Sequence, residues 1–401
     1  MEKCLVTKLN GSSDNSELLK VGEMRMKISK AEIPTNEAQG FSISVNKPVT
    51  LEIIGEGYFT DKTLTENKGK TLVLNTGNNE ILVSNNDIEI AILDKYSITG
   101  LSKNYQSGPI DGCNNISINL SDLKYSLELT NLFLTNTQVS GDIVNLKNLT
   151  KLTNLALSST QVSGDIVNLK NLTELTNLFL TNTQVSGDIE GLKNLTKLTN
   201  LALNDTQVSG DIVNLKNLTE LTNLYSDNCK VSGDIVNLKN LTKLSYMALN
   251  DTQVSGDIEG LKNLTELTVM YLNSSEISGD IEAFNGMLKA IHLSIANGTF
   301  TGDLSKIPDN CYFISFARNK NTVLSWTNRP STAYILAIEG NAKITDVDKM
   351  LQDQAQCQVG ITESSPIWYK TIECAGNRTS ASDAAVATLQ SKGYTVSITP
   401  A

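Results

Sequence analysis

One short phrase, Val-Ser-Gly-Asp-Ile or a close variant of it, recurs at a fixed interval through the middle of this chain. A constant period of this length is the signature of a solenoid, in which each repeat packs only on its neighbours. The full repeat reads L-x-x-L-x-L-x-x-T-x-V-S-G-D-I-x-x-L-x-x-L-T-x. Its glycine stands at eight positions, each 23 residues after the one before: Gly141, Gly164, Gly187, Gly210, Gly233, Gly256, Gly279 and Gly302.

The spacing of the apolar residues predicts two elements within each repeat. The L-x-L segment alternates with a period of two, which indicates a short strand whose leucines point inward. Farther along, Ile143, Leu146 and Leu149 are three residues apart. That spacing favours a turn of 3₁₀ helix on the opposite side of the coil.

These repeats resemble the leucine-rich repeat family, and their S-G-D-I segment is similar to the S-G-x-I-P segment of its plant-type subclass, without the proline. The resemblance implies an α/β solenoid: a curved right-handed coil with a parallel sheet on its concave face, serving recognition or scaffolding and rarely catalysis. In the family, the ninth position is usually Asn or Cys and bonds the backbone between turns. Here a hydroxyl version of that ladder is expected, from Thr137, Thr160, Thr183, Thr206, Cys229, Thr252 and Ser275.

Three regions are expected along the 401 residues. Residues 1–86 contain short, often alternating segments separated by turn clusters, which predicts an all-β domain that caps or anchors the solenoid. Residues 87–350 are assigned to the solenoid, beginning with Ile90-Ala-Ile92 as a first L-x-L strand. Residues 351–401 are assigned to a small α/β cap.

The end of the chain predicts two helices and a last strand. One helix opens near Thr345 and reaches about Gln354, and another runs from Ser382 to Gly393, before a strand over 394–398. This unit is expected to cover the open edge of the parallel sheet. The six cysteines match no zinc or redox spacing and are expected to be free and buried, with Cys357–Cys374 as the one bridge worth testing.

Equivalent residues of stacked strands form columns, and three columns are expected to face the concave side. In one of them aromatic residues alternate with alanine along the solenoid. Aromatic rings flanked by amides suit a sugar ring or a protein partner equally well, although the alternation also follows if adjacent rings would simply crowd. The candidate ligand-binding residues are Phe133, Phe179, Tyr225, Tyr246, Tyr271, His292, Asn177, Asn200 and Asn223.

Two charged columns accompany the repeats. At one position the sign alternates, with Lys151, Lys197 and Lys243 interleaved with Glu174 and Glu220, which predicts attraction between neighbouring turns and a duplicated unit of 46 residues. The other column repeats the aspartate of the S-G-D-I phrase. N-capping of the following turn is its expected task, with stacked calcium ligands as the alternative.

Composition and motifs argue against several classes of function. With 33 basic and 43 acidic residues the net charge is −10, and no basic stripe suits nucleic acid. No signal peptide and no apolar run long enough to span a membrane is seen, so we expect no membrane insertion. The single histidine, His292, has no predictable nucleophile beside it, so we expect neither an enzyme nor a cofactor or metal.

The biological setting is predicted from a second resemblance. Residues 4–9 and 22–33 are similar to the start of virion proteins from phages of gut Bacteroidales. This implies a phage fibre or decoration protein in the virion, anchored to other virion proteins through residues 1–86 and binding a protein or glycan on a host cell surface. The alternative is a bacterial cell-surface or cytoplasmic interaction protein of the adhesin type.

Overall fold

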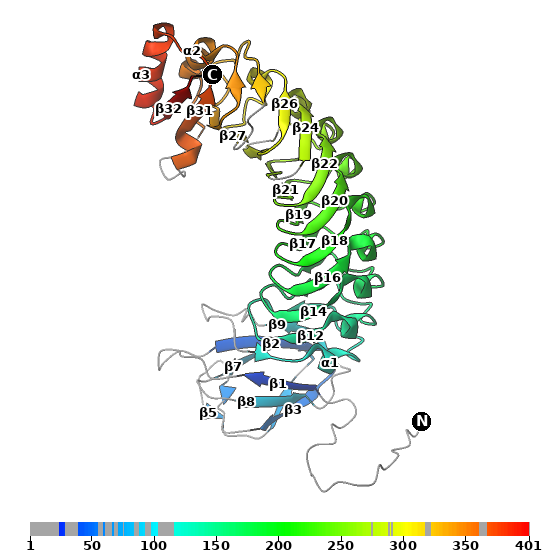
Figure 1. Ribbon diagram of the computed structural model, residues 1–401. Coiled ribbons are helices and arrows are strands. Elements are labelled where there is room, and N and C mark those ends of the chain that lie inside the picture. Colours follow the sequence, from blue (N-terminus) through cyan, green and yellow to red (C-terminus); the bar gives the residue numbers. More distant parts are fainter. Residues whose placement is uncertain are drawn as a thin grey trace.

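The structure is a computed structural model that describes residues 24–28, 39–54, 59–60, 66–67, 71–74, 76–83, 88–92, 98–102, 116–273, 276–287, 289, 292–316, 322–360 and 367–400. The chain forms a crescent, with strands of the N-terminal region at one end and the C-terminal helices at the other (Figure 1). Seven complete turns of 23 residues, which we number one to seven from Leu129, Leu152, Leu175, Leu198, Leu221, Leu244 and Leu267, form the regular part.

A parallel sheet lines the concave side of the crescent. Each strand contributes an inward leucine, methionine or isoleucine to the core, and equivalent residues of successive turns are in register, as in the pairing of Leu178 with Leu201. The strands are β11 (Asn131–Phe133), β13 (Asn154–Ala156), β15 (Asn177–Phe179), β17 (Asn200–Ala202), β19 (Asn223–Tyr225), β21 (Tyr246–Ala248), β23 (Val269–Tyr271), β25 (His292–Ser294), β27 (Phe313–Phe316) and β29 (Ala337–Gly340). This sheet confirms the predicted solenoid.

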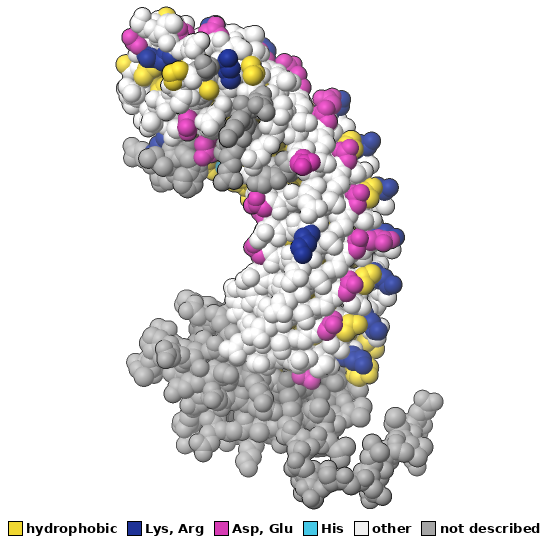
Figure 2. Space-filling view, in the orientation of Figure 1, with side chains coloured by type: hydrophobic (Ala, Val, Ile, Leu, Met, Phe, Trp, Pro, Cys, Tyr) yellow, Lys and Arg dark blue, Asp and Glu magenta, His cyan; other side chains and the backbone are white. Residues whose placement is uncertain are grey.

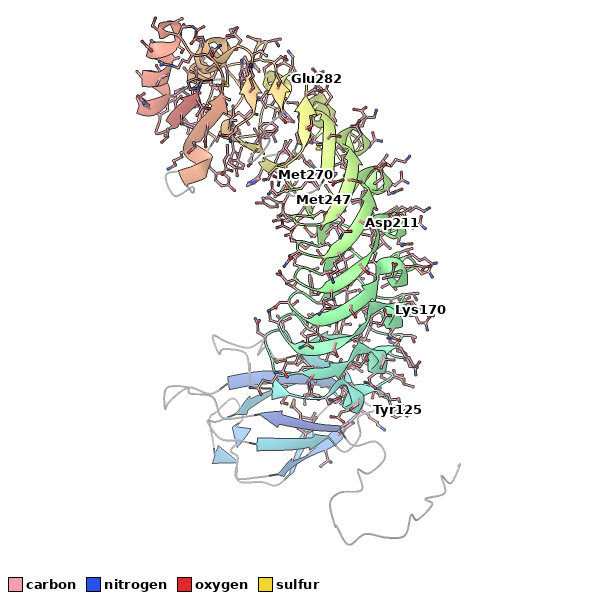
Figure 3. All side chains as sticks on the ribbon, viewed as in Figure 1. Tyr125, Lys170, Asp211, Met247, Met270 and Glu282 are labelled. Atoms are coloured by element: carbon pink, nitrogen blue, oxygen red, sulfur yellow. The ribbon has the colours of Figure 1, made fainter. Side chains whose placement is uncertain are left out.

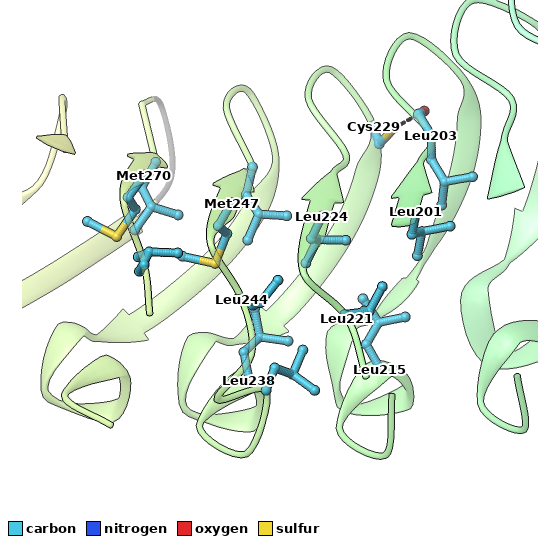
Figure 4. Close-up of a cluster of buried hydrophobic side chains, with 14 of the residues drawn as sticks. Leu201, Leu203, Leu215, Leu221, Leu224, Cys229, Leu238, Leu244, Met247 and Met270 are labelled. Carbon is cyan, nitrogen blue, oxygen red and sulfur yellow. Dashed lines mark hydrogen bonds between the residues drawn. The ribbon is translucent and has the colours of Figure 1, made fainter. Parts of the chain in front are cut away.

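A second parallel sheet, which the sequence did not predict, is built from the Q-V-S-G-D segments. Its strands are β12 (Ser140–Asp142), β14 (Gln161–Asp165), β16 (Gln184–Asp188), β18 (Gln207–Asp211), β20 (Lys230–Asp234), β22 (Gln253–Asp257), β24 (Glu276–Asp280) and β26 (Thr299–Thr301). In strands β14 to β24 the valine or isoleucine is buried while the residue before it is exposed, and Phe300 takes the buried position in β26. The solenoid therefore has two sheets that meet over one leucine core (Figure 4).

The convex side carries one 3₁₀ turn per repeat, as the three-residue spacing predicted. In every turn the aspartate of the S-G-D-I phrase is the N-cap, and its side chain accepts the N–H two residues later, for example from Val144 to Asp142 at 2.7 Å. The predicted N-capping is thus confirmed. The turns are η2 (Ile143–Leu146), η3 (Ile166–Leu169), η4 (Ile189–Leu192), η5 (Ile212–Leu215), η6 (Ile235–Leu238), η7 (Ile258–Leu261), η8 (Ile281–Gly286) and η9 (Leu304–Lys306).

The glycine before each capping aspartate is required by close packing between turns. Gly187 has φ +95°, and a Cβ built there would overlap Oδ1 of Asp165, the cap of the preceding turn. The same contact recurs at Gly210, where the overlapping atom belongs to Asp188. The Gly-Asp pair of the repeat therefore works across two turns: the aspartate caps its own 3₁₀ helix, and the next glycine leaves room for that carboxylate.

The threonine ladder differs from the expectation. The hydroxyl of Thr137 donates to the Leu134 carbonyl of its own turn at 2.6 Å, and Thr160, Thr183, Thr206 and Thr252 do the same. Of the members of this column that the structure describes, only Cys229 reaches a backbone carbonyl of the preceding turn, donating to that of Leu203 at 2.9 Å (Figure 4). Each of these threonines therefore closes its own loop instead of linking two turns. Ser275 lies outside the described residues.

The N-terminal region contains two sheets, and one of them continues the solenoid. Strands β10, β1, β8, β3 and β6 form an antiparallel sheet, and β2 pairs antiparallel with β7 and β9. Strand β9 then pairs in parallel with β11 of turn one. The bounds are β1 (Met24–Ile28), β2 (Gln39–Val45), β3 (Val49–Ile54), β4 (Phe59–Thr60), β5 (Glu66–Asn67), β6 (Thr71–Leu74), β7 (Gly77–Val83), β8 (Ile88–Ile92), β9 (Ile98–Ser102), β10 (Ile116–Ser117) and α1 (Leu120–Leu123).

One sequence interpretation of this region was wrong. The segment Ile90-Ala-Ile92, expected to be the first L-x-L strand of the solenoid, belongs to β8 and pairs antiparallel with β1 and β3. An alternating triplet fits either environment, because an antiparallel sheet with one buried face shows the same period of two. The first strand to pair in parallel with the repeats is instead β9.

The C-terminal region adds strands to the concave sheet instead of covering its edge. The two predicted helices are present as α2 (Val347–Gln356) and α3 (Asp383–Ser391), and Gly393 follows with φ +87°. Strand β32 (Thr395–Thr399) pairs in parallel with β31 (Thr371–Ala375), which pairs in turn with β29. The remaining elements are β28 (Val323–Leu324), β30 (Lys343–Ile344), η10 (Ile367–Lys370) and η11 (Ser380–Ser382). Cys357 and Cys374 are both free and buried, so the two residues form no disulfide bridge with each other.

The alternating lysines and glutamates pair two by two along the solenoid. Lys151 bonds Glu128 at 2.7 Å, Lys197 bonds Glu174 at 2.7 Å, Lys243 bonds Glu220 at 2.6 Å, and Lys289 pairs with Glu266. Among the described residues, each lysine of this column bonds the glutamate of the turn before it. All the partners are largely exposed, so each pair contributes only about 0–1 kcal/mol, but together they mark the 46-residue doublet.

We expect that deleting one whole doublet, Leu175 through Glu220, leaves a folded, shorter solenoid. The deletion joins Glu174 to Leu221, so Lys243 takes the place of Lys197 beside Glu174 and the sheet register is kept. Deleting one turn, 175–197, should also fold but brings Glu174 beside Glu220, a repulsion of about 0–1 kcal/mol. Urea denaturation and gel filtration measure both variants. Aggregation of the doublet deletion with a stable single-turn deletion would contradict the doublet.

Candidate functional site

The predicted concave asparagines are joined to one another by side-chain hydrogen bonds. Five consecutive turns carry this amide ladder: Asn131, Asn154, Asn177, Asn200 and Asn223. From Asn154 onward, each Nδ2 donates to Oδ1 of the preceding turn at 2.5–2.6 Å and to the hydroxyl of the threonine before it in sequence. Both N–H groups of Asn177, Asn200 and Asn223 are therefore used inside the protein, although these side chains are only half-buried.

The aromatic column is divided into two parts. Phe133 and Phe179 are half-buried, and the small, buried side chain of Ala156 lies between them, while that of Ala202 separates Phe179 from Tyr225. Where the amide ladder ends, Tyr246 fills the ladder position, and its ring therefore lies between those of Tyr225 and Tyr271. The ring centroids are 4.6 Å and 5.8 Å from that of Tyr246. We call Tyr225, Tyr246 and Tyr271 the tyrosine row.

His292 does not lie on the exposed surface, contrary to the sequence expectation. Its ring is buried against Phe313 of the next strand and Tyr369 of η10, with centroids 4.5 Å and 5.4 Å away. Nδ1 of His292 is 2.8 Å from the Tyr369 hydroxyl. Burial lowers the pKa of His292 to about 4, so the ring is neutral at physiological pH.

The far end of the tyrosine row is therefore closed by protein. The ring of Tyr271 meets His292 edge-on at 4.7 Å, and beyond it lie Phe313 and Tyr369. Phe313 stands in phase with the ladder column, but Tyr369 comes from the cap and has no periodic signal in the sequence. A ligand on the tyrosine row thus has protein behind it on one side and open concave sheet on the other.

The tyrosine hydroxyls remain protonated at physiological pH. Burial raises the pKa of Tyr225, and it raises that of Tyr271 as the largest of several influences. For Tyr246 burial again contributes most, followed by the neighbouring tyrosines and by Asp227. The tyrosine row consequently offers neutral rings and hydroxyl groups, which suit stacking and hydrogen bonding but not acid–base catalysis near neutral pH.

A second ladder runs beside the tyrosine row and contains one carboxylate. Asn204 Oδ1 accepts the N–H of Asp227 at 2.9 Å, Asp227 Oδ1 accepts that of Asn250 at 2.7 Å, and Asn250 Oδ1 accepts that of Asn273 at 2.9 Å. Burial raises the pKa of Asp227, and the charges of Asp205 and Asp251 raise it further, while the bonds from Asn250 lower it. Asp227 was not among the predicted site residues.

The convex surface has a different character. Charged and apolar side chains line the outer edge of the crescent, while the side facing the viewer is mostly uncharged (Figure 2). Lys170, Asp211 and Glu282 point outward there, and Met247 and Met270 lie inside (Figure 3).

In the part of the chain that the structure describes, no group of three or more His, Cys, Asp or Glu side chains could hold a metal ion. In the same part, no helix is long and apolar enough to cross a membrane.

Comparison with known proteins supports the fold. No protein-family profile and no curated protein matches the sequence. A solved plant peptide hormone receptor, RGFR1 in complex with RGF2, is 24% identical with a TM-score of 0.53, over 60% of this chain and 40% of that one. An internalin, InlF of Listeria monocytogenes, is 20% identical with a TM-score of 0.47, over 77% of this chain and 85% of that one.

A third solved structure is the Arabidopsis receptor kinase HAESA with the peptide hormone IDA and the co-receptor SERK1. It is 21% identical with a TM-score of 0.46, over 56% of this chain and 40% of that one. The chain thus spans less than half the length of either plant receptor. Together with the in-register parallel strands and the amide ladder, the likeness to RGFR1 shows that this protein has the leucine-rich repeat solenoid fold, as its sequence predicted.

Proposed function

We propose that this protein is a non-enzymatic binding module whose concave face takes a polypeptide partner at turns five to seven. The tyrosine row carries the proposal, since three half-buried rings from three neighbouring strands form a continuous aromatic surface. Tyrosine is enriched at the energetic centres of protein interfaces. RGFR1, which shares this fold, is in complex with RGF2. The polypeptide class rests here on the tyrosine row and not on that likeness.

A glycan fits this surface less well than a polypeptide does. Sugar recognition combines a ring face with amide groups that bond hydroxyls. Here the N–H groups of Asn200 and Asn223 are already used in the amide ladder.

The virion setting, the bacterial alternative and the anchoring role of residues 1–86 stay predictions from the sequence. Of the segments that suggested the virion, the structure describes only residues 24–28.

We expect the double variant Tyr225→Ala with Tyr271→Ala to lose its partner. Removing interface aromatics typically costs about 2 kcal/mol or more, roughly thirtyfold in affinity. Peptides selected from a displayed random library on the parent protein serve as probes, and a glycan array is tested in parallel. Their dissociation constants are measured by biolayer interferometry, and circular dichroism checks that the variant is folded.

Two control variants locate the effect. Phe133→Ala with Phe179→Ala removes aromatics from the same column outside the tyrosine row, and Lys193→Ala with Lys239→Ala changes the convex side. Both should keep the affinity of the parent. Equal loss in either control, no loss in the tyrosine variant, or signal on the glycan array with no selected peptide would contradict a polypeptide site on the tyrosine row.

A further inference from the structure

Turn five differs from turn four mainly in one short segment. Its sequence L-Y-S-D-N-C-K-V-S-G stands where turn four has L-A-L-N-D-T-Q-V-S-G, whereas the following I-V-N-L-K-N-L-T segment is identical in the two turns. The residues that appear in no other complete turn at the same position are Ser226, Asp227, Cys229 and Lys230. The changes are therefore concentrated beside the first ring of the tyrosine row.

The second ladder, which runs from Asn204 through Asp227 and Asn250 to Asn273, does not explain why Asp227 is charged. Asp227 accepts the N–H of Asn250 in the same way as Asn204 and Asn250 accept theirs, so an amide oxygen would do this work equally well. The carboxylate is half-buried, which costs free energy when no counter-ion is present. Among the described residues, no basic side chain forms an ion pair with the carboxylate of Asp227. Lys230 lies instead in a shallow pocket that Asp205 and Asp251 also line and that does not include Asp227.

The other polar group at this place is also a hydrogen-bond acceptor. Asn223 ends the amide ladder, because Tyr246 replaces the next asparagine and supplies no amide N–H. Its two donors are used by Asn200 and Thr222, which leaves its Oδ1 as the last acceptor of the ladder. Two acceptors, one of them charged, thus flank aromatic faces, which attract cations through their quadrupole.

From this arrangement we propose that the polypeptide partner lays a cationic side chain, an arginine, on the tyrosine row with its guanidinium beside the carboxylate of Asp227. Arginine fits better than lysine because its planar guanidinium stacks on aromatic rings while its N–H groups bond several acceptors. The net charge of −10 also favours a basic partner. This inference rests on the proposed function and names the chemistry of its ligand.

Selected peptides test the inference in a double-mutant cycle. We expect the peptides that need the tyrosine row to share an arginine, and Asp227→Asn to weaken them about tenfold or more. Replacing that arginine by glutamine should weaken binding to the parent by a similar factor but hardly change binding to Asp227→Asn. The asparagine keeps the ladder bond and removes an unpaired charge, so the melting temperature of the variant should be no lower than that of the parent.

The matched control is Asp251→Asn. It removes one carboxylate of turn six from the pocket that contains Lys230, and it should leave the affinity for the peptides unchanged. Peptides that depend on the tyrosines but carry no shared basic residue, or that bind Asp227→Asn as tightly as the parent, would overturn the arginine site and leave the proposed function standing. Peptides unaffected by the tyrosine variant, or no selected peptide at all, would overturn both.

Discussion

Replacing Leu201 by alanine should lower the free energy of unfolding by roughly 2–5 kcal/mol. Leu201 lies in the middle strand of the regular part and is fully buried between Leu178 and Leu224 of the adjacent strands (Figure 4). Its removal leaves a cavity that neighbouring turns cannot fill, because their own leucines are held in register by the sheet. Urea denaturation followed by circular dichroism measures the loss.

Leu127→Ala provides the comparison for this effect. Leu127 is 49% exposed at the start of the solenoid, so its truncation should change stability by no more than about 0.5 kcal/mol. A midpoint for Leu201→Ala equal to that of the parent would show that the leucine is not inward. Equal losses for the two leucines would instead attribute the effect to composition and not to position.

Gly187→Ala should destabilise the protein by about 2–4 kcal/mol, although it adds a single methyl group. One part is the strain of a positive φ for a residue with a Cβ, about 1–3 kcal/mol. The other part is the displaced carboxylate of Asp165, which loses its capping bond to Val167, worth about 1 kcal/mol. Thermal and urea unfolding of the purified variant give the sum.

Two further variants separate these parts. Gly393 also has a positive φ, but open space surrounds its added Cβ, so Gly393→Ala should show the strain alone. Combining Gly187→Ala with Asp165→Ala removes the overlapping carboxylate, and the double variant should be less destabilised than the sum of the two single variants. Strict additivity would mean that the contact between turns does not matter.

The regular turns could be predicted from sequence because each depends on local spacing repeated many times. The leucines of L-x-L point inward, and Asp142 and its equivalents cap 3₁₀ turns. Both features recur at the same positions of every regular repeat, because successive repeats stack in register. The second sheet escaped prediction for an equally local reason. In Gln184–Asp188 a single buried valine precedes a glycine of positive φ, and this resembles a turn more than a strand.

The candidate site depended more on contacts that no period reveals. His292 occupies a surface column, but Tyr369, 77 residues later, covers it. The asparagines were expected to bind ligand through their amides, yet stacking at strand distance lets each amide satisfy the next. Tyr246 was placed correctly by its column. Asp227 belongs to a ladder whose hydrogen bonds between turns the sequence period does not reveal.

The paired lysines and glutamates have a consequence for how this protein changes length. Turns one to four continue the amide ladder and contain no member of the tyrosine row, so duplicating a 46-residue doublet there keeps both the amide ladder and the lysine–glutamate pairs. Each added doublet lengthens the solenoid by about 10 Å. Growth in this part moves the tyrosine row away from the N-terminal strands in fixed steps without altering it. The length of the solenoid and the structure of the tyrosine row can therefore change independently of each other.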